Sequence, residues 1–254
     1  MNEDIYGEYP TSPVVYAACD SKYFMEHAAP FIYSANDIGK DIHIHICNPT
    51  EEVWTKSMIL NADTDVKVTY TANDIDFSTS GAQQGPVAQE AERTYYACLR
   101  FLYLQYIVVR CGAALALDID CILMRKFDFP NTAVGYFPRE SLEGTQGWEQ
   151  KGTKVAAGIF YLEDRAHAVA SQIRNRIEKG PFNWFLDQIA LAEVIDFVPK
   201  ENLTEYDNDF MDWDFRQGTA IWTGKGDRKY NNEVYVKAKN EFDRYDSATT
   251  RCWS

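Results

Sequence analysis

Three features are scarce in this 254-residue sequence, and each scarcity excludes a class of protein. No apolar run approaches the roughly 20 residues that a helix needs to cross a bilayer. The six cysteines include no Cys-x-x-Cys pair and therefore do not indicate a zinc site or a disulfide framework. Basic residues number 25 against 38 acidic ones. The resulting net charge of −13 argues against a nucleic-acid partner, which needs a basic excess.

The remaining composition is that of an ordinary globular protein. Hydrophobic residues make up 46% of the chain and charged residues 25%, and the length suffices for a sizeable core. The first four residues are acidic and polar, unlike the cationic and then apolar start of a secretory signal. Most cysteines lie in or beside apolar segments, where a free thiol behaves as a small hydrophobe. We therefore expect a reduced, cytoplasmic protein without a transmembrane segment.

The first half of the sequence alternates between strand and helix patterns. Buried or alternating apolar residues predict strands over 13–19, 41–47, 66–70 and 113–117, with helices over 21–36, 50–60 and 90–109 between them. Such alternation is typical of a Rossmann-like, mostly parallel sheet flanked by helices, the α/β class. A polar stretch over 73–86 is interpreted as a loop that orders over a ligand.

The second half is less regular. Its patterns predict strands over 132–137 and 155–162, helices over 164–177 and 183–194, and a polar loop over 141–154. From residue 201 onward the chain is aromatic, acidic and irregular. No repeat or Pro/Gly-rich linker divides the sequence, so we expect a single domain over 1–254.

The most informative motif is Asp118-Ile119-Asp120, which closes the apolar run 113–117. A strand buried on both faces reads as a continuous apolar stretch, and ligands in such folds lie beyond the carboxyl ends of the strands. Two carboxylates there favour a hard divalent cation and, through it, a phosphate. The same Asp-x-Asp spacing recurs at Asp63/Asp65, Asp74/Asp76, Asp207/Asp209 and Asp212/Asp214. Only the pair at Asp118 follows a strand that reads as buried.

Four segments, taken in order, resemble the GT-A glycosyltransferases, in particular the family-eight type that includes glycogenin and bacterial galactosyltransferases. They are Val15–Tyr23, Tyr95–Phe101 leading to Leu117–Asp120, Ala157–Leu162, and Phe185–Gln188. The resemblance implies a single GT-A-type domain, with a nucleotide-binding half over 13–123 and an irregular acceptor half over 124–254. It also implies a metal-dependent transferase that uses a nucleotide-diphosphate sugar, most readily a uridine one, with retention of configuration.

The resemblance assigns a metal site to the Asp-x-Asp motif. Asp118 and Asp120 would hold Mn²⁺ or Mg²⁺, with Asp120 the more direct ligand and Asp118 partly contacting the sugar or ribose. Two positions differ from the family pattern: Ile221 stands where the family has a third, histidine ligand, and Ala156 where it often has an asparagine. Water or phosphate oxygens would then complete the coordination shell. The alternative is a merely solvated acidic turn.

Further donor-binding roles follow from the first two segments. Ala17 and Asp20 lie on the opening strand, and Asp20 would accept hydrogen bonds from the base or ribose. The alternative for Asp20 is a helix N-cap, and both roles are compatible. Tyr23 would stack on the base or serve the core. Arg100 would orient Asp118 or contact the donor.

The later segments are assigned to the sugar and the diphosphate. Asp187 and Gln188 would lie at the donor sugar as catalytic residues, and their alternative is a solvated helix turn. Gly224, Lys225 and Lys229 belong to a basic island in an acidic tail, which suits a diphosphate or forms an ordinary charged turn.

Two other patterns and two other functions were weighed. His43 and His45 share one face of a strand, which can bind zinc, but a structural role is favoured because no third ligand has suitable spacing. The first alternative function is a non-catalytic nucleotide-sugar or glycan-binding relative, which the missing histidine and asparagine favour. A nucleotidyltransferase is disfavoured because 19–23 contains no glycine. The acceptor, whether glycan, lipid or protein, is not specified by any motif.

Overall fold

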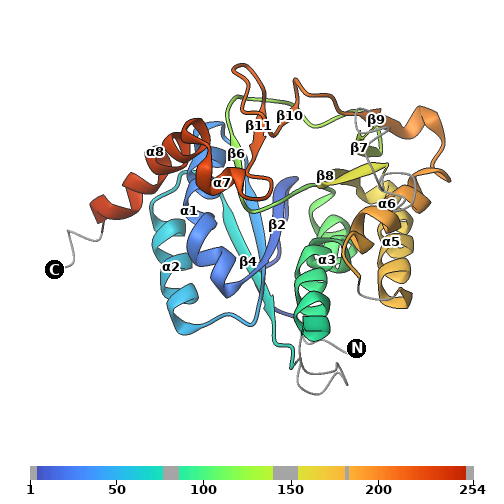
Figure 1. Cartoon of the computed structure of the whole chain (residues 1–254), viewed down its shortest axis with the longest axis horizontal. Coiled ribbons are helices and arrows are strands. Elements are labelled where there is room, and N and C mark those ends of the chain that lie inside the picture. Colours follow the sequence, from blue (N-terminus) through green and yellow to red (C-terminus); the bar gives the residue numbers. More distant parts are fainter. Residues whose placement is uncertain (1–4, 77–85, 140–153, 181–182, 250–254) are drawn as a thin grey trace.

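The computed structural model describes residues 5–76, 86–139, 154–180 and 183–249 (Figure 1). Their central feature is an eight-stranded sheet in the order β1-β4-β3-β2-β5-β8-β7-β9. The strands are β1 (Tyr6–Gly7), β2 (Val14–Asp20), β3 (Ile42–Cys47), β4 (Val68–Asn73), β5 (Ala113–Leu117), β7 (Val134–Pro138), β8 (Val155–Glu163) and β9 (Leu203–Glu205). This confirms the predicted α/β class and the four strands of the first half.

The direction of the strands changes in the middle of the sheet. Strands β4, β3, β2 and β5 pair in parallel, whereas β8 runs antiparallel to both β5 and β7. The antiparallel start of β8 therefore lies at the same edge as the carboxyl ends of β5 and β7. Asp118 and Asp120, which the sequence predicts to be functional, follow β5 at that edge.

Helices cover both faces of the sheet (Figure 1). Alternate side chains of β2 pack against the helices of opposite faces, because side chains along a strand point to opposite faces of the sheet. Val15 and Ala17 pack in the cluster with α1 (Ser21–Asp37) and α2 (Glu51–Ala62). Tyr16 and Ala18 pack in the cluster with the helices of the other face. These are α3 (Pro86–Cys111), α5 (His167–Lys179) and α6 (Leu186–Ile195).

Local caps explain where the first two helices begin. The Asp20 carboxylate accepts a hydrogen bond of 2.7 Å from the Tyr23 amide at the start of α1. The Thr50 hydroxyl accepts one of 3.4 Å from the Val53 amide at the start of α2. Each occupies an amide that has no partner within its helix. The predicted cap at Asp20 is thus confirmed.

Two predictions for the second half were wrong, one on the start of a helix and one on the regularity of the tail. Helix α6 begins at Leu186 rather than Asn183, because Phe185 adopts a left-handed backbone with φ of 75° and interrupts helical geometry. The tail from residue 201 is also more regular than predicted. It contains β10 (Met211–Asp212), β11 (Ile221–Thr223), α7 (Arg228–Asn231) and the 17-residue α8 (Glu233–Thr249).

The tail strands form a second, three-stranded sheet in the order β10-β11-β6, where β6 is Cys121–Leu123. Because β6 follows Asp120 directly, the antiparallel pair Thr223–Cys121 brings the end of β11 beside the Asp-x-Asp motif. Helix α8 packs against α1 and, through Tyr235 and Ala238, against Ile122 and Trp222 (Figure 1). A segment that is distant in sequence thereby reaches the end of β5.

The cysteines, the absence of a predicted membrane helix and the predicted loops can be compared with the described residues. The described cysteines Cys19, Cys47, Cys98, Cys111 and Cys121 are buried free thiols. No helix in the described part of the chain is long and apolar enough to cross a membrane. The loops predicted over 73–86 and 141–154 fall mostly outside the described residues. The η2 turn (Asp164–Ala166) and the η3 turn (Lys200–Asn202) precede α5 and β9.

Candidate active site

The candidate site lies at the sheet edge where β5 ends. Asp118 follows β5, and its amide donates a hydrogen bond of 3.3 Å to the Gly158 carbonyl of β8. A Cβ atom at position 158 would lie 3.0 Å from Asp118 Oδ2, so a side chain there would crowd the carboxylate. The glycine therefore leaves room for Asp118, whose side chain is 38% exposed.

Arg100 of α3 connects the predicted acids at this edge. Its buried guanidinium donates from Nη1 to Asp118 Oδ1 and from Nη2 to the Ala157 carbonyl at 2.7 Å. The same Nη2 lies 3.7 Å from Asp187 Oδ2. Burial alone would lower the pKa of Arg100, but Asp118 and Asp187 raise it, so the guanidinium stays charged. The structure thus shows the predicted contact of Arg100 with Asp118 and adds Asp187, which the sequence had named separately.

Asp187 and Gln188 begin the first turn of α6. Asp187 is buried, which raises its pKa to about 6, although Arg100 and the Gln188 amide oppose the shift. Gln188 Oε1 accepts a hydrogen bond of 2.5 Å from Arg139 Nη1. Arg139 follows β7 and was not predicted from the sequence. Only the antiparallel pairing of β7 with β8 brings it to this edge.

Asp120 is held by a different cation. Its Oδ2 atom accepts a hydrogen bond of 2.9 Å from Lys229 Nζ, and both residues are buried. The same ammonium lies 3.2 Å from the Tyr23 hydroxyl and 4.7 Å from the centre of the Tyr23 ring. Burial opposes the charge of Lys229, whereas Asp120 and Tyr23 raise the pKa above that of free lysine. Lys229 is therefore protonated at neutral pH.

The backbone of Asp120 is also engaged. Its carbonyl accepts hydrogen bonds from the Tyr235 hydroxyl at 2.5 Å and from the Gly224 amide at 3.3 Å. A Cβ atom at Gly224 would lie 2.7 Å from Lys229 Cβ and 2.9 Å from the Tyr235 hydroxyl. Gly224 is thus required by close packing, and Tyr235 is a site neighbour that the sequence did not indicate.

Lys225 is more open than Lys229. Its Nζ lies 5.0 Å from the centre of the Trp213 ring, and the residue keeps exposed surface. Partial desolvation and the positive charges of Arg139 and Arg228 lower the pKa of Lys225 to about 8, although Asp118 opposes them. An anion that contacts Lys225 would relieve this repulsion.

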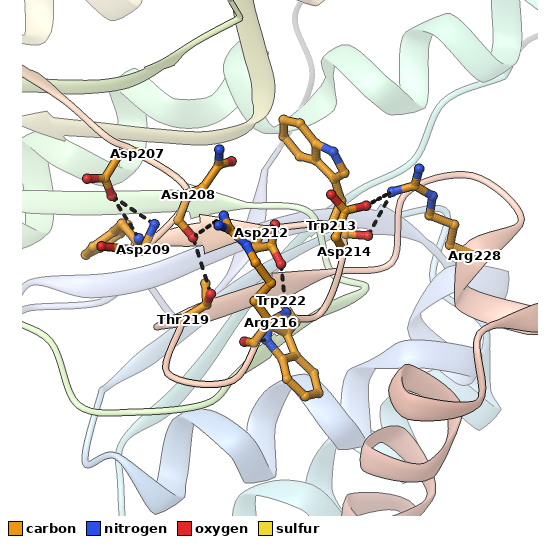
Figure 2. A network of polar contacts seen from close by, with 11 residues as sticks. Asp207, Asn208, Asp209, Asp212, Trp213, Asp214, Arg216, Thr219, Trp222 and Arg228 are labelled. Carbon is orange, nitrogen blue, oxygen red and sulfur yellow. Dashed lines mark hydrogen bonds and ion pairs between the residues drawn. The ribbon is translucent and has the colours of Figure 1, made fainter. Parts of the chain in front are cut away.

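A polar network in the tail (Figure 2) supports the segment that contains Lys225 and, in α7, Lys229. Arg228 Nη1 donates to the Trp213 carbonyl at 2.9 Å and to Asp214 Oδ1 at 2.7 Å. Within the same network, Arg216 is held by Asp212, and its carbonyl accepts from Trp222 Nε1 at 2.9 Å. Arg228, the residue before Lys229, is therefore anchored to the residues that follow β10.

The remaining predicted residues play structural roles or, like Tyr23, border the cluster through Lys229. Ala17 is fully buried within the sheet. Tyr23 is 37% exposed, and its ring lies 5.3 Å from that of His27. His43 and His45 bond to hydroxyl and amide groups of β4, as a structural role predicts. Whether Ala17, Asp20 or Tyr23 binds a nucleotide stays a prediction.

The residues around Asp120 do not fit a resident divalent ion as they stand. Asp118 Oδ2 and the buried, unpartnered Asp120 Oδ1 are the oxygens left for one. Ile221 is buried in β11, and no group of three His, Cys, Asp or Glu side chains in the described residues is arranged to hold a metal. An ion on the Asp120 carboxylate would also lie within roughly 5 Å of Lys229 Nζ. Their repulsion is about 7 kcal/mol at an effective dielectric constant of about 20. The metal site therefore stays a prediction of the sequence, one that would require Lys229 to move.

A surface hollow of about 280 Å³ lies elsewhere, beside α5. It is lined by apolar groups such as Val134, Val169 and Phe197, and by Arg165, which is already paired with Glu163. It contains none of the acids described above and does not define the reaction.

Comparison with solved structures identifies the fold. The galactosyltransferase LgtC, in complex with donor and acceptor sugar analogs, matches 92% of this chain and 95% of its own, with a TM-score of 0.58 and 13% identity. The chain has the GT-A fold. The bifunctional glycosyltransferase WbbM matches 92% of this chain with a TM-score of 0.61 and 13% identity. GlyE of Streptococcus pneumoniae matches 94% with a TM-score of 0.54 and 13% identity.

All three neighbours are glycosyltransferases by name, and their similarity confirms the GT-A fold that the four sequence segments predicted. The chain spans half of the WbbM chain and 65% of the GlyE chain. No protein-family model and no curated protein sequence matches it. The GT-A similarity is therefore one of three-dimensional structure at low sequence identity.

Proposed function

We propose that this protein is a glycosyltransferase that moves a sugar from a nucleotide-diphosphate donor, a uridine one, to a hydroxyl acceptor with retention of configuration. In the reaction the bond between the anomeric carbon and the β-phosphate oxygen breaks. A bond from the anomeric carbon to the acceptor oxygen forms, and the acceptor proton leaves to a phosphate oxygen or solvent. The acceptor is a glycan, a lipid or a protein.

The observation that carries the proposal is the charged cluster at the end of β5, within a GT-A fold. Arg100 joins Asp118 and Asp187, and Arg139 holds Gln188 beside them. The Asp118 side chain is 38% exposed, which leaves it able to accept a sugar or ribose hydroxyl. Asp187 supplies a carboxylate whose charge Arg100 preserves despite burial, which suits a group facing positive charge that develops at an anomeric carbon.

Basic residues supply the matching site for the diphosphate. Lys225 and Arg139 are basic residues of this region: Arg139 lowers the pKa of Lys225, whereas Asp118 raises it. Positive charge fixed in this position stabilises the departing diphosphate without reorganisation at the moment of reaction. The chain as a whole is acidic, so this local basic region is where an anionic donor is expected to enter.

The test is release of UDP from a panel of UDP-sugars, with and without sugar acceptors, by wild type and by Asp187→Asn. We expect slow hydrolysis by wild type, a fall of about 100-fold or more in the variant, and loss of wild-type activity below about pH 6 as Asp187 protonates. The matched control is Asp196→Asn, an exposed acid at the other end of α6. Equal turnover by the two variants would show that Asp187 takes no part in catalysis. Failure of wild type to bind or turn over any nucleotide sugar would overturn the proposal.

A further inference from the structure

Lys229 lies where it neutralises the second acid of the Asp-x-Asp motif from inside the protein. It comes from α7, 109 residues after Asp120, and its ammonium is 2.9 Å from Asp120 Oδ2. The side chain is buried, unlike that of its neighbour Arg228. A buried lysine requires a partner, and here the partner is the carboxylate assigned to a metal by sequence resemblance.

Several contacts fix Lys229 beside Asp120. Pairing of β11 with β6 places Gly224 against the Asp120 carbonyl, and Tyr235 of α8 donates to the same atom. The missing side chain at Gly224 leaves the space that Lys229 Cβ occupies. The network of Figure 2 holds Arg228 toward Trp213 and Asp214, so the next residue turns toward Asp120. The ion pair is therefore built by the fold rather than by two flexible surface chains.

The ammonium also retains capacity for a ligand. A lysine ammonium has three N–H donors, and Asp120 and Tyr23 accept two of them. Tyr23 is partly exposed, so the ion pair lies beneath the surface on which the sequence places the nucleotide. Lys225, which precedes α7 in the chain, adds a second positive charge.

We propose that Lys229 takes the place of the divalent cation, so that the protein binds its nucleotide-diphosphate donor without a metal. Asp120 orients the ammonium, and the ammonium supplies the positive charge toward the diphosphate. This inference rests on the proposed function, because it specifies how the same donor is held. It assigns Asp120 as a positioning residue and Lys229 as the donor-binding group.

The experiment is calorimetric titration of UDP into the full chain, once in EDTA and once in excess Mn²⁺. Wild type is expected to bind with the same affinity, within about twofold, in both conditions. Lys229→Met should lose about 10- to 100-fold in EDTA, because a charge-assisted contact is removed. In that variant Mn²⁺ should restore binding, since Asp120 is released to coordinate the ion. Lys67→Met, which removes an exposed lysine paired with Glu8, is the matched control and should bind as wild type.

A double variant separates the charge effect from a folding defect. Lys229→Met with Asp120→Asn leaves no buried unpaired charge, and its thermal transition verifies that it folds. It should bind UDP as weakly as Lys229→Met in EDTA and, lacking the carboxylate, should not respond to Mn²⁺. Direct titration of Mn²⁺ followed by electron paramagnetic resonance should show binding to Lys229→Met and none to wild type.

The outcomes distinguish this inference from the function on which it rests. Wild type that binds UDP only with Mn²⁺ would overturn the inference and leave the glycosyltransferase proposal intact. The same holds if Lys229→Met binds UDP in EDTA as tightly as wild type. Absence of UDP binding under every condition would overturn both.

Discussion

Single residues at the end of β5 differ in how firmly their charges are held. Lys229 is buried against Asp120, whereas Lys225, four residues earlier, is exposed above the Trp213 ring. The first keeps its proton because a carboxylate accepts from it. The second faces Arg139 and Arg228, which oppose its charge. Lys225 and Lys229 are therefore expected to lose their protons at different pH values.

This contrast predicts a pH dependence of donor binding. Because partial desolvation and neighbouring cations lower the pKa of Lys225 to about 8, its ammonium loses a proton as pH rises from 7 to 9. Binding of an anion then requires uptake of that proton, so the Kd for UDP should rise by up to about tenfold per pH unit above the pKa. Lys225→Arg should flatten this profile, because arginine stays charged. The measurement is UDP affinity between pH 6.5 and 9.5. An unchanged profile in the variant would mean that Lys225 does not contact the diphosphate.

At the scale of elements, β3 and β4 carry a ladder of buried polar side chains. The rings of His43 and His45 bridge successive residues of β4: His43 contacts Thr69 and Thr71, and His45 contacts Thr71 and Asn73. The Asn73 oxygen accepts from His45 Nε2, and burial lowers the pKa of the ring, so that in the neutral ring Nδ1 accepts from Thr71. The ladder depends on neutral histidines.

The ladder predicts loss of stability in mild acid. Burial lowers the pKa of His45 to about 4 and that of His43 well below its ordinary value, against about 6.5 in the unfolded chain. As pH falls from about 6.5 toward 4, the unfolded state binds protons that the folded state does not, and the free energy of unfolding decreases. The contribution of His45 is about 3 kcal/mol across that window.

The check is urea denaturation at intervals between pH 7 and pH 4.5. The slope of the unfolding free energy against pH should decrease by up to about 1.4 kcal/mol per unit in His45→Gln, because one titrating group is removed. His167→Gln, at an exposed histidine near α5, provides the comparison and should keep the wild-type slope. Identical slopes in all three proteins would contradict the buried, neutral state of His45.

Across the whole molecule, Arg100 joins parts that are distant in sequence. It lies on α3 and contacts Asp118 after β5, the Ala157 carbonyl of β8 and Asp187 of α6. These contacts link the predicted nucleotide-binding and acceptor halves. Removing the guanidinium would leave two acids without their common cation, one of them fully inside the protein.

We therefore expect Arg100→Met to lower the free energy of unfolding at pH 7 by about 3–5 kcal/mol. Lowering the pH to 5 should recover part of this loss, since Asp187 is then protonated and needs no cation. Adding Asp187→Asn should likewise recover part of it. Arg165→Met breaks the exposed pair with Glu163 and should cost less than about 1 kcal/mol. A comparable small loss in Arg100→Met would show that the buried cluster does not connect the halves.

Much of the fold was predictable because its signals are local. The apolar run 113–117 indicated a strand buried on both faces, and Asp118 and Asp120 marked its end. Helix α8 was missed, although Asn232 caps it and Tyr235, Ala238 and Phe242 recur at helical spacing. The direction of β8 was not predictable, because a doubly buried strand has the same pattern in either direction.

The sequence by itself determined the alternation of strands and helices, the caps and the acids at the end of β5, because these depend on contacts between near neighbours. The sequence also predicted that Arg100 orients Asp118, but only the tertiary structure decided what Asp120 and Gln188 face. Arg139 reaches Gln188 through the antiparallel turn of the sheet, and Lys229 reaches Asp120 through the pairing of β11 with β6. A pattern of residues shows where a carboxylate lies along the chain. The cation that neutralises Asp120 is set by packing against a segment 109 residues away, which no local pattern reveals.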